Sequence, residues 1–306
     1  MRSGDRIETE NHAGICRITC GWKKPGLPLD AVRRYWRDVH SPAIARRPGI
    51  WEYRHFQYDA VRPLFAPIDG VSQACPAGEQ LMWLSDVRYA DDDALALFAG
   101  EPNPEVRGQL LGDIDLIVEQ STTYKAVGTM ARTLVDSSAM IPPQGAPPVP
   151  AYSFFFRARG DEAAFRRAMV ALADAWAVVA GVVRLRLSLL EAPDVSAERA
   201  AGYPIKTHPP ERQYQAWIDL AVQDDAVLAA LPLGGVASEI AAIHAYPVAA
   251  NYTSNYAGHP TFVGLRGFPA WDALTAIGGY NQAQPQIMKW MFGPVAEGVT
   301  LERVAR

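Results

Sequence analysis

The stretch that decides the fold is Trp22-Lys-Lys-Pro-Gly-Leu-Pro-Leu-Asp-Ala-Val-Arg-Arg-Tyr-Trp-Arg-Asp-Val-His-Ser-Pro42. It leaves a strand, turns at prolines and a glycine, and then carries an apolar stripe with the spacing of a helix. The members of this stripe are Val32, Tyr35, Trp36 and Val39. Asp30 stands where an N-cap residue belongs, and Gly49 stands where the chain must leave the helix for a second strand. The stretch therefore predicts a strand–helix–strand unit.

The two halves of the chain repeat one order of elements. The first half predicts strands at 14–22, 50–58, 80–89 and 121–128, with helices at 29–47 and 91–111. The second half predicts strands at 151–158, 182–190, 213–221 and 250–257, with helices at 161–178 and 223–244. A constant shift places Gly49 on Gly181 and Asp92 on Asp224. Asp161 is the expected N-cap of the helix whose apolar stripe is Phe165, Met169, Leu172 and Trp176.

The predicted fold class is α+β. A βαββαβ unit forms a four-stranded antiparallel sheet with both helices on one face, so its other face needs cover. Two such units cover each other, which predicts two tandem ferredoxin-like repeats packed sheet to sheet as a pseudo-dimeric α+β barrel. We expect an apolar pocket between the two sheets.

The expected domains are an N-terminal repeat at 1–140, a linker at 141–150 that holds five prolines, and a degenerate second repeat at 151–306. The second repeat carries an aromatic-rich extension between Tyr252 and Trp290. This extension is either a lid over the barrel or an oligomer contact, and the sequence leaves a homodimer open.

Composition narrows the class of protein. The chain has 306 residues, 49% of them hydrophobic, and a formal net charge of -4, so we expect a globular protein that does not bind nucleic acid. Three cysteines without metal-binding spacing, Cys16, Cys20 and Cys75, indicate a reducing compartment and no metal site. No leader and no membrane span are recognisable, so the expected location is the cytoplasm, away from membranes.

The quoted stretch, together with Arg46-Arg-Pro-Gly-Ile50, resembles the EthD family of dimeric α+β barrels. The resemblance rests on the Lys-x-Pro-Gly turn, Tyr35-Trp36, His40-Ser-Pro42 and Pro48-Gly49, and it covers residues 14–128. It implies an enzyme for aromatic or polyketide-like substrates that works without a cofactor, although members with no known activity exist. The second half lacks the motif, because Leu172 stands in the place of His40.

His40 is the first candidate for chemistry. It follows Trp36 by four residues on one helical face, and Pro42 should bend or end the helix beside it. Unpaired carbonyls there would favour the imidazolium, whereas burial would favour the neutral ring, so His40 is a candidate general acid/base. The alternative is a histidine that only caps the helix end.

A second set of candidates lies on the strands. Trp51, Tyr53, His55 and Gln57 alternate onto one face of the strand at 50–58, which is an unusual mixture of aromatic bulk and polar tips. We predict Tyr53 and His55 as catalytic residues beside His40. The predicted substrate-binding residues are Tyr35, Trp36, Trp51, Gln57, Trp83 and Tyr124. Asp86 is considered as a group that orients a histidine, and simple core packing is the alternative for every aromatic residue.

These features predict a cofactor-independent lyase or isomerase, of the decarboxylase or dehydratase type, that acts on a small hydrophobic aromatic or polyketide-like compound. Phosphate-loop, dinucleotide, serine-elbow and zinc-helix motifs are not recognisable in the sequence. One alternative is a non-catalytic protein that binds a hydrophobic metabolite. The other is a haem- or oxygen-dependent enzyme on the same barrel fold.

Overall fold

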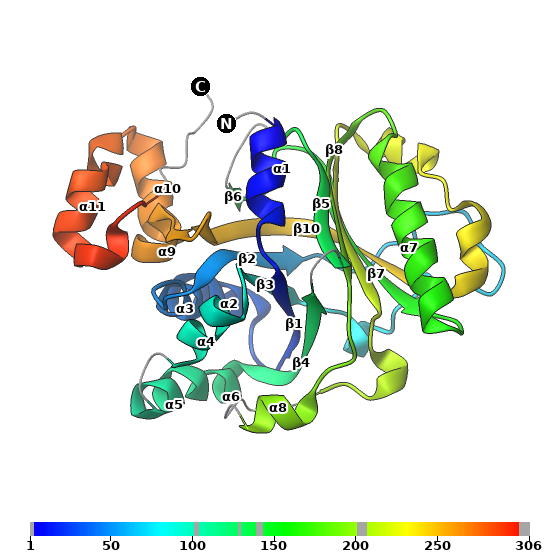
Figure 1. The fold of residues 1–306 in the computed structure, drawn as a ribbon, viewed down its shortest axis with the longest axis horizontal. Helices are drawn as coiled ribbons and strands as arrows, with labels where there is room; N and C mark the ends of the chain where they lie inside the picture. The colour runs from blue at the N-terminus through cyan, green and yellow to red at the C-terminus, as the bar shows by residue number, and fades with distance from the viewer. Residues whose placement is uncertain (1–2, 101–103, 128–129, 139–142, 201–206, 300–306) are drawn as a thin grey trace.

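A computed structural model describes residues 3–100, 104–127, 130–138, 143–200 and 207–299. Each half of the chain forms an antiparallel sheet with the same strand order, β4-β1-β3-β2 in the first half and β10-β7-β9-β8 in the second (Figure 1). The strands of the first half are β1 (Ile15–Lys23), β2 (Ile50–Tyr58), β3 (Trp83–Tyr89) and β4 (Val118–Val127). Those of the second half are β7 (Ala151–Ala158), β8 (Val182–Leu189), β9 (Ala216–Val222) and β10 (Ile240–Tyr256). Two tandem ferredoxin-like sheets are thereby confirmed.

One long strand joins the two sheets. β10 has 17 residues, and its first part pairs with β7 while its last part pairs with β2 of the other half. A short strand, β5 (Ala131–Asp136), follows β4 and pairs with β8, so each half also supplies a strand to the other. The sheets pack face to face as a pseudo-dimeric α+β barrel, as the sequence predicts.

The helix between β1 and β2 does not stop at His40. It runs as α2 (Leu29–Tyr35), a π-helical turn over Trp36–His40, and α3 (Ser41–Ala45). Ser41 keeps helical dihedral angles, φ -61° and ψ -42°, and its N–H donates to the Trp36 carbonyl five residues back. Of the two outcomes predicted beside His40, a bend or an end of the helix, the end is therefore wrong, because the wider turn accommodates a residue that has no N–H.

Local details correct two other predictions for this helix. Its N-cap is Pro28 rather than Asp30, which lies in the first turn. Val39 is 51% exposed and is not part of the buried stripe. By contrast, α7 (Glu162–Ala177) begins after Asp161, whose Oδ1 accepts the Ala164 N–H at 2.7 Å, and its predicted stripe is buried.

The second helix of each half is broken. In the first half it consists of α4 (Asp92–Gly100), α5 (Pro104–Gly112) and the short α6 (Ile114–Ile117). In the second half the helix predicted at 223–244 is wrong, because only two 3₁₀ segments form, Asp225–Ala230 and Gly234–Glu239, before β10 begins at Ile240. Pro232 and the pair Gly234-Gly235 interrupt an otherwise helix-like stretch.

The two glycines that align in the repeat have the same backbone role. Gly49 and Gly181 both adopt left-handed dihedral angles, with φ of +86° and +91°. A Cβ atom on Gly49 would lie 2.1 Å from the Ala94 carbonyl oxygen of α4. Only glycine fits this junction between helix and strand, which explains why both halves carry it.

Side chains fill one end of the space between the two sheets. Phe56 and Tyr58 of β2 meet Phe155 of β7, Trp217 of β9 and Tyr246 of β10 in one buried cluster. The ring centroids of Phe56 and Trp217 are 5.5 Å apart in an edge-to-face arrangement. The apolar pocket predicted between the sheets does not lie at this end, because bulky residues of both inner faces interlock there.

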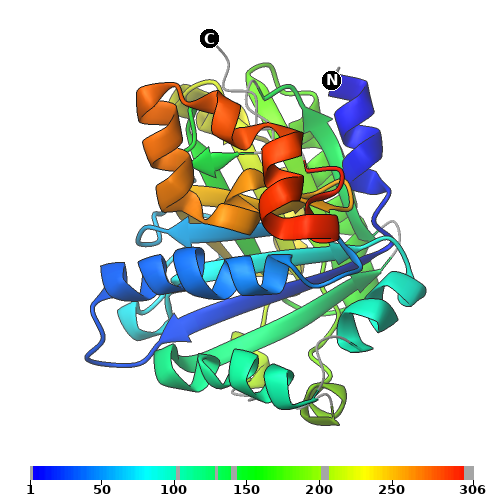
Figure 2. The same ribbon diagram turned by 90° about the vertical axis from the view of Figure 1, so that its left-hand side faces the viewer.

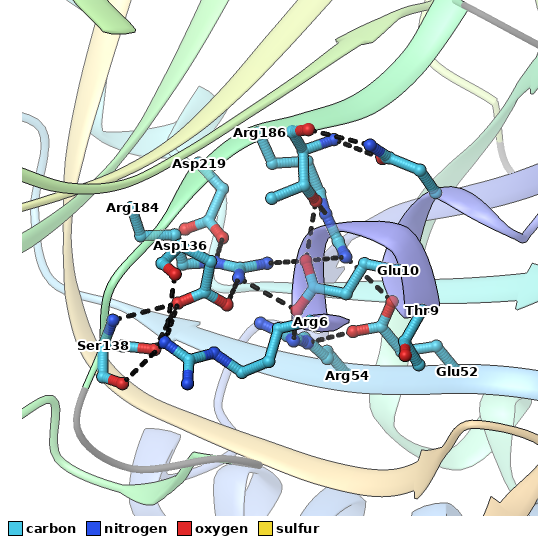
Figure 3. Close-up of polar contacts among 12 residues, drawn as sticks. Arg6, Thr9, Glu10, Glu52, Arg54, Asp136, Ser138, Arg184, Arg186 and Asp219 are labelled. Carbon is cyan, nitrogen blue, oxygen red and sulfur yellow. Dashed lines mark hydrogen bonds and ion pairs between the residues drawn. The ribbon is translucent and has the colours of Figure 1, made fainter. Parts of the chain in front are cut away.

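Buried charges fill the other end of the barrel (Figure 3). Glu10, on the N-terminal helix α1 (Ser3–Asn11), lies among Arg54 of β2 and Arg184 and Arg186 of β8. Four further carboxylates and two further arginines belong to this ion cluster: Glu52, Asp86, Asp136, Asp219, Arg6 and Arg88. Since its members come from both halves and from α1, the ion cluster ties all three together.

The segment predicted as a linker does more than separate the halves. Gln144 and Gly145 form a short strand, β6, that pairs with Tyr252 and Asn251 of β10. Residues 139–142 lie outside the described part of the chain. The proposed boundaries of the two domains stay predictions.

The C-terminal extension forms three helices, of which the first packs on α3 (Figure 2). They are α9 (Phe262–Arg266), α10 (Phe268–Ile277) and α11 (Pro285–Phe292), with their own core around Phe262, Trp271 and Met288. A Cβ atom on Gly264 would lie 2.0 Å from the Ser254 carbonyl oxygen, so α9 sits tightly against β10. In the described part of the chain, none of the helices has the length and apolar character needed to cross a membrane.

Candidate functional site

The main pocket lies between the first sheet and its own helices, not between the two sheets. Its accessible volume is about 110 Å³, enough for a small ring compound or a few waters. The sheet provides a floor of mixed polar and apolar side chains, and the helices provide an apolar roof. The residues that line it are Arg17, Thr19, Trp36, His40, Ile44, Arg47, Tyr53, Ser85, Val87, Tyr89, Phe98, Leu111, Ile114, Ser121, Thr123, Pro193, Val195 and Thr207.

The second half of the chain closes one side of this pocket. Pro193, Val195 and Thr207 belong to the connection between β8 and β9, and they line the pocket of the first half. The first half therefore holds the pocket, and the second half supplies part of its wall. A smaller pocket of about 60 Å³ lies at the charged end of the barrel, next to Arg54 and Arg184.

His40 is held in the pocket wall by a carboxylate. The His40 Nδ1 atom lies 3.0 Å from Oδ2 and 3.2 Å from Oδ1 of Asp113, which sits between α5 and α6. The side chains of His40 and Asp113 are 6% and 12% exposed. A carboxylate at this distance accepts the Nδ1 proton, fixes the orientation of the ring and leaves Nε2 for a reacting group.

The π-helical turn places Trp36 against His40, and the next residue, Ser41, is linked to Tyr53 of the pocket lining. The Trp36 ring stacks on the His40 ring with centroids 4.2 Å apart, and its Nε1–H donates to Ser85 Oγ at 3.2 Å. Ser41 Oγ and the Tyr53 hydroxyl are 2.9 Å apart. Burial raises the pKa of Tyr53 above its usual value, so Tyr53 enters the pocket as a neutral phenol.

His55 lies behind this wall rather than in the pocket lining. Its ring is fully buried and lies 6.2 Å from the Trp36 ring and 6.3 Å from the Tyr252 ring, centroid to centroid. Burial, with His40 and nearby arginines adding to the effect, lowers the pKa of His55 to about 3. A ring with this pKa is neutral at neutral pH, and it lies outside the set of residues that line the pocket.

The remaining predicted binding residues are dispersed. Gln57 donates to the Arg33 carbonyl at 3.2 Å, and Trp83 packs behind Trp36 with ring centroids 4.5 Å apart. Trp51 donates to the Thr9 carbonyl at 2.7 Å, and so it faces α1. Tyr124 faces the barrel interior, on the opposite side of the sheet from the pocket, and accepts the Tyr214 N–H at 3.0 Å. These four residues do not line the pocket around His40.

The carboxylate that orients His40 is not the one that the sequence suggests. Asp86 faces the barrel interior and binds Arg88 Nε at 3.0 Å, so it does not orient His40. The orienting carboxylate is Asp113, which also accepts the Tyr35 hydroxyl at 3.3 Å. Only the position of Asp113 directly after a helix marks it in the sequence, which is too weak a signal to single it out.

Three buried histidines make the stability of the protein dependent on pH. Burial lowers the pKa of His55 to about 3 and the pKa values of His208 and His244 to about 4, from an ordinary value of 6.5. Below pH 6.5 the unfolded chain therefore binds protons that the folded chain does not bind. We expect the free energy of unfolding to fall between pH 6.5 and 4, by up to about 1.4 kcal/mol per pH unit for each ring.

Urea unfolding at pH 7 and pH 5 tests this expectation. Replacing His55 by glutamine should reduce the loss of stability on acidification, because the unfolded chain then has one histidine fewer to protonate. Replacing the exposed His12 by glutamine is the matched control and should leave the loss unchanged. Equal losses in the wild type and in His55→Gln would show that His55 is not the source.

Comparisons with known proteins give distant structural matches only. No family model and no curated protein matches the chain. A proposed monooxygenase of Fusobacterium nucleatum has 10% identity and a TM-score of 0.44. The match covers 81% of this chain and 97% of the monooxygenase chain. A proposed monooxygenase of Lactobacillus acidophilus has 8% identity and a TM-score of 0.42, and the match covers 79% of this chain and 97% of that protein. An anthrone oxidase-like protein has 10% identity and a TM-score of 0.42, and the match covers 79% of this chain and 93% of that protein. The fold assignment rests on the strand order, and the EthD resemblance stays a prediction.

Proposed function

We propose that the protein is a cofactor-independent lyase or isomerase, of the decarboxylase or dehydratase type, for a small hydrophobic aromatic or polyketide-like compound. The observation that supports this most is the His40–Asp113 pair, 3.0 Å apart, in the wall of a largely apolar pocket. An oriented imidazole in a water-poor site is suited to move protons at near-neutral pH. The EthD-like motif around His40 agrees with this function.

Each residue of the site has a distinct task in this proposal. His40 accepts or delivers a proton at Nε2, and Asp113 stabilises the imidazolium while it exists. The Trp36 ring holds the His40 ring in place by stacking on it, and the Tyr53 hydroxyl, neutral in this site, donates to a substrate oxygen. In a decarboxylation, the bond to the leaving carboxylate breaks, its electron pair stays on carbon, and His40 protonates that carbon.

A conversion assay without added cofactor tests the proposed function. The full chain is incubated under argon with aromatic hydroxy acids, β-keto acids and unsaturated lactones, and products are identified by mass spectrometry. We expect conversion of at least one class without dioxygen. A compound that binds without conversion would instead support a binding protein, and conversion that requires dioxygen would support an oxygenase; either result contradicts the proposal.

Asp113 should matter as a positioning residue. Replacing Asp113 by asparagine removes the charge that stabilises the His40 imidazolium, so we expect turnover to fall about tenfold or more. The pH at which turnover is half-maximal should also move downward, which loss of packing alone would not cause. Asp113→Glu should restore part of the rate. An unchanged pH profile in Asp113→Asn would contradict this role.

A further inference from the structure

The smaller pocket, of about 60 Å³, lies inside the barrel and is called the barrel pocket below. It lies where the aromatic cluster meets the ion cluster, because Phe56 of the first and Arg54 and Arg184 of the second line it. Both halves of the chain form its wall, with Phe56 on β2 and Ala151 on β7. It is separate from the site around His40, since no described residue lines both pockets.

A register shift in β10 brings Asn251 into the wall of the barrel pocket. Along a regular strand, residues three apart point to opposite faces. The pairing of β10 with β2 shifts between Val248 and Ala250, and Val248 and Asn251 both line the pocket. Asn251 is only 8% exposed, and among the residues that the structure describes its Oδ1 atom has no hydrogen-bond partner. A molecule in the pocket that carries an O–H group would satisfy this buried acceptor.

Much of the remaining wall is apolar. Pro143, Pro147 and Pro148 close the pocket on the side of the predicted linker, and a proline has no N–H that needs a partner. The other apolar residues of the wall are Phe56, Val149, Ala151, Ala221 and Val248. Such a wall favours a molecule that is itself mainly apolar.

The charged residues of the wall are paired with one another (Figure 3). Arg184 donates to Asp136 at 2.7 Å and to Asp219 at 3.0 Å. Arg54 donates to Glu10 at 2.6 Å. The ion cluster consists of five carboxylates and five arginines, so its formal charges cancel. A neutral guest leaves this balance intact, whereas a charged guest would disturb it in a low-dielectric space.

We propose that the barrel pocket binds a small neutral molecule that is mainly apolar and donates one hydroxyl hydrogen to Asn251 Oδ1. The volume sets its size, because about 60 Å³ at about 10–15 Å³ for each water-sized position admits about four to six non-hydrogen atoms. A short aliphatic alcohol meets these conditions of size, charge and hydrogen bonding. The proposal does not depend on the proposed function, because it concerns a different pocket.

Methyl NMR titrations with sec-butanol and butanone test the proposal. The two compounds have the same number of non-hydrogen atoms and nearly the same shape, but only the alcohol donates a hydrogen bond. We expect the methyl signals of Ala151, Ala221 and Val248 to shift, and sec-butanol to bind more tightly than butanone by about threefold or more. Asn251→Ala should make the two dissociation constants equal, because it removes the acceptor.

A variant that fills the pocket locates the binding. Ala221→Leu should abolish binding of both compounds, whereas the same substitution at the exposed Ala163 of α7 is the matched control and should change nothing. A melting temperature close to the wild type shows that a variant is folded, and Asn251→Ala decides alone if Ala221→Leu does not fold. Methyl signals that do not shift, equal binding of the two compounds by the wild type, or binding that a folded Ala221→Leu protein retains would each overturn the proposal.

The result is independent of the chemistry at His40. His40→Ala should bind sec-butanol like the wild type, because the imidazole does not line the barrel pocket. Selective binding of sec-butanol that depends on Asn251 would support the proposal even if the protein converts no substrate. Loss of this binding in His40→Ala would place the alcohol in the other pocket and contradict the proposal.

Discussion

Turnover should fall by a factor of about 10² to 10⁴ when His40 is replaced by alanine, with the fold retained. The imidazole lies in the pocket wall and is paired with a carboxylate, an arrangement that suits a general acid or base. Its loss leaves Tyr53 and the apolar surface of the pocket, which do not replace the acid or base. The measurement is the rate of product formation at saturating substrate, for the substrate found in the conversion assay.

Two controls make the His40 result specific. His259 is exposed and lies on the C-terminal extension, so His259→Ala should keep the full rate. In His40→Ala, free imidazole in the buffer should restore part of the activity, because it enters the space left by the ring. A circular dichroism spectrum and melting temperature close to the wild type exclude unfolding. Wild-type turnover in a folded His40→Ala protein would remove His40 from the mechanism.

The free energy of unfolding should fall by about 3–5 kcal/mol when Glu10 is replaced by alanine. The Glu10 carboxylate lies 2.6 Å from Arg54 Nη2, 2.6 Å from Arg186 Nη2 and 3.0 Å from Arg184 Nη1. Burial alone would raise the pKa of Glu10, but Arg184, Arg186 and Arg54 outweigh burial and hold it well below the ordinary range. Without Glu10, these arginines lose a shared partner inside the barrel, where water does not replace it.

Urea unfolding at pH 7 measures this effect, with Glu8→Ala as the matched control. Glu8 lies on the same helix as Glu10 but is exposed, so its loss should change the free energy of unfolding by less than about 0.5 kcal/mol. Glu10→Gln keeps the shape and loses the charge, and it should also be strongly destabilised. If Glu10→Ala is no less stable than Glu8→Ala, the ion cluster contributes nothing net to stability.

The repeat explains why the sequence predicts the fold so well. The glycine at the exit of each first helix and the apolar stripe of α7 follow from local rules, and both are found in the structure. The helix predicted at 223–244 is wrong for a local reason too. Its alanine-rich stretch has high helix propensity, but Pro232 and two glycines interrupt the helix. Pairing of β10 with two partner strands then decides its conformation, and such tertiary pairing is invisible in a local pattern.

The site is harder to predict than the fold, because the sequence does not show on which face of the sheet the pocket lies. Alternation along β3 places Ser85 and Val87 toward the helices and Asp86 and Arg88 into the barrel, but the sequence does not say which face holds the pocket. His40 is found because a motif marks it. Asp113 is 73 residues away in the sequence and reaches His40 only through the packing of α5 and α6 on the helix layer.

The shared strand β10 also limits how the two halves can move when a ligand enters the pocket. Many enzymes with two halves open and close by hinge bending about a linker. Here the same strand is hydrogen-bonded into both sheets. A hinge motion between the two halves would have to break the hydrogen bonds between β10 and its partner strands. We therefore expect a ligand to enter the pocket without separation of the two halves.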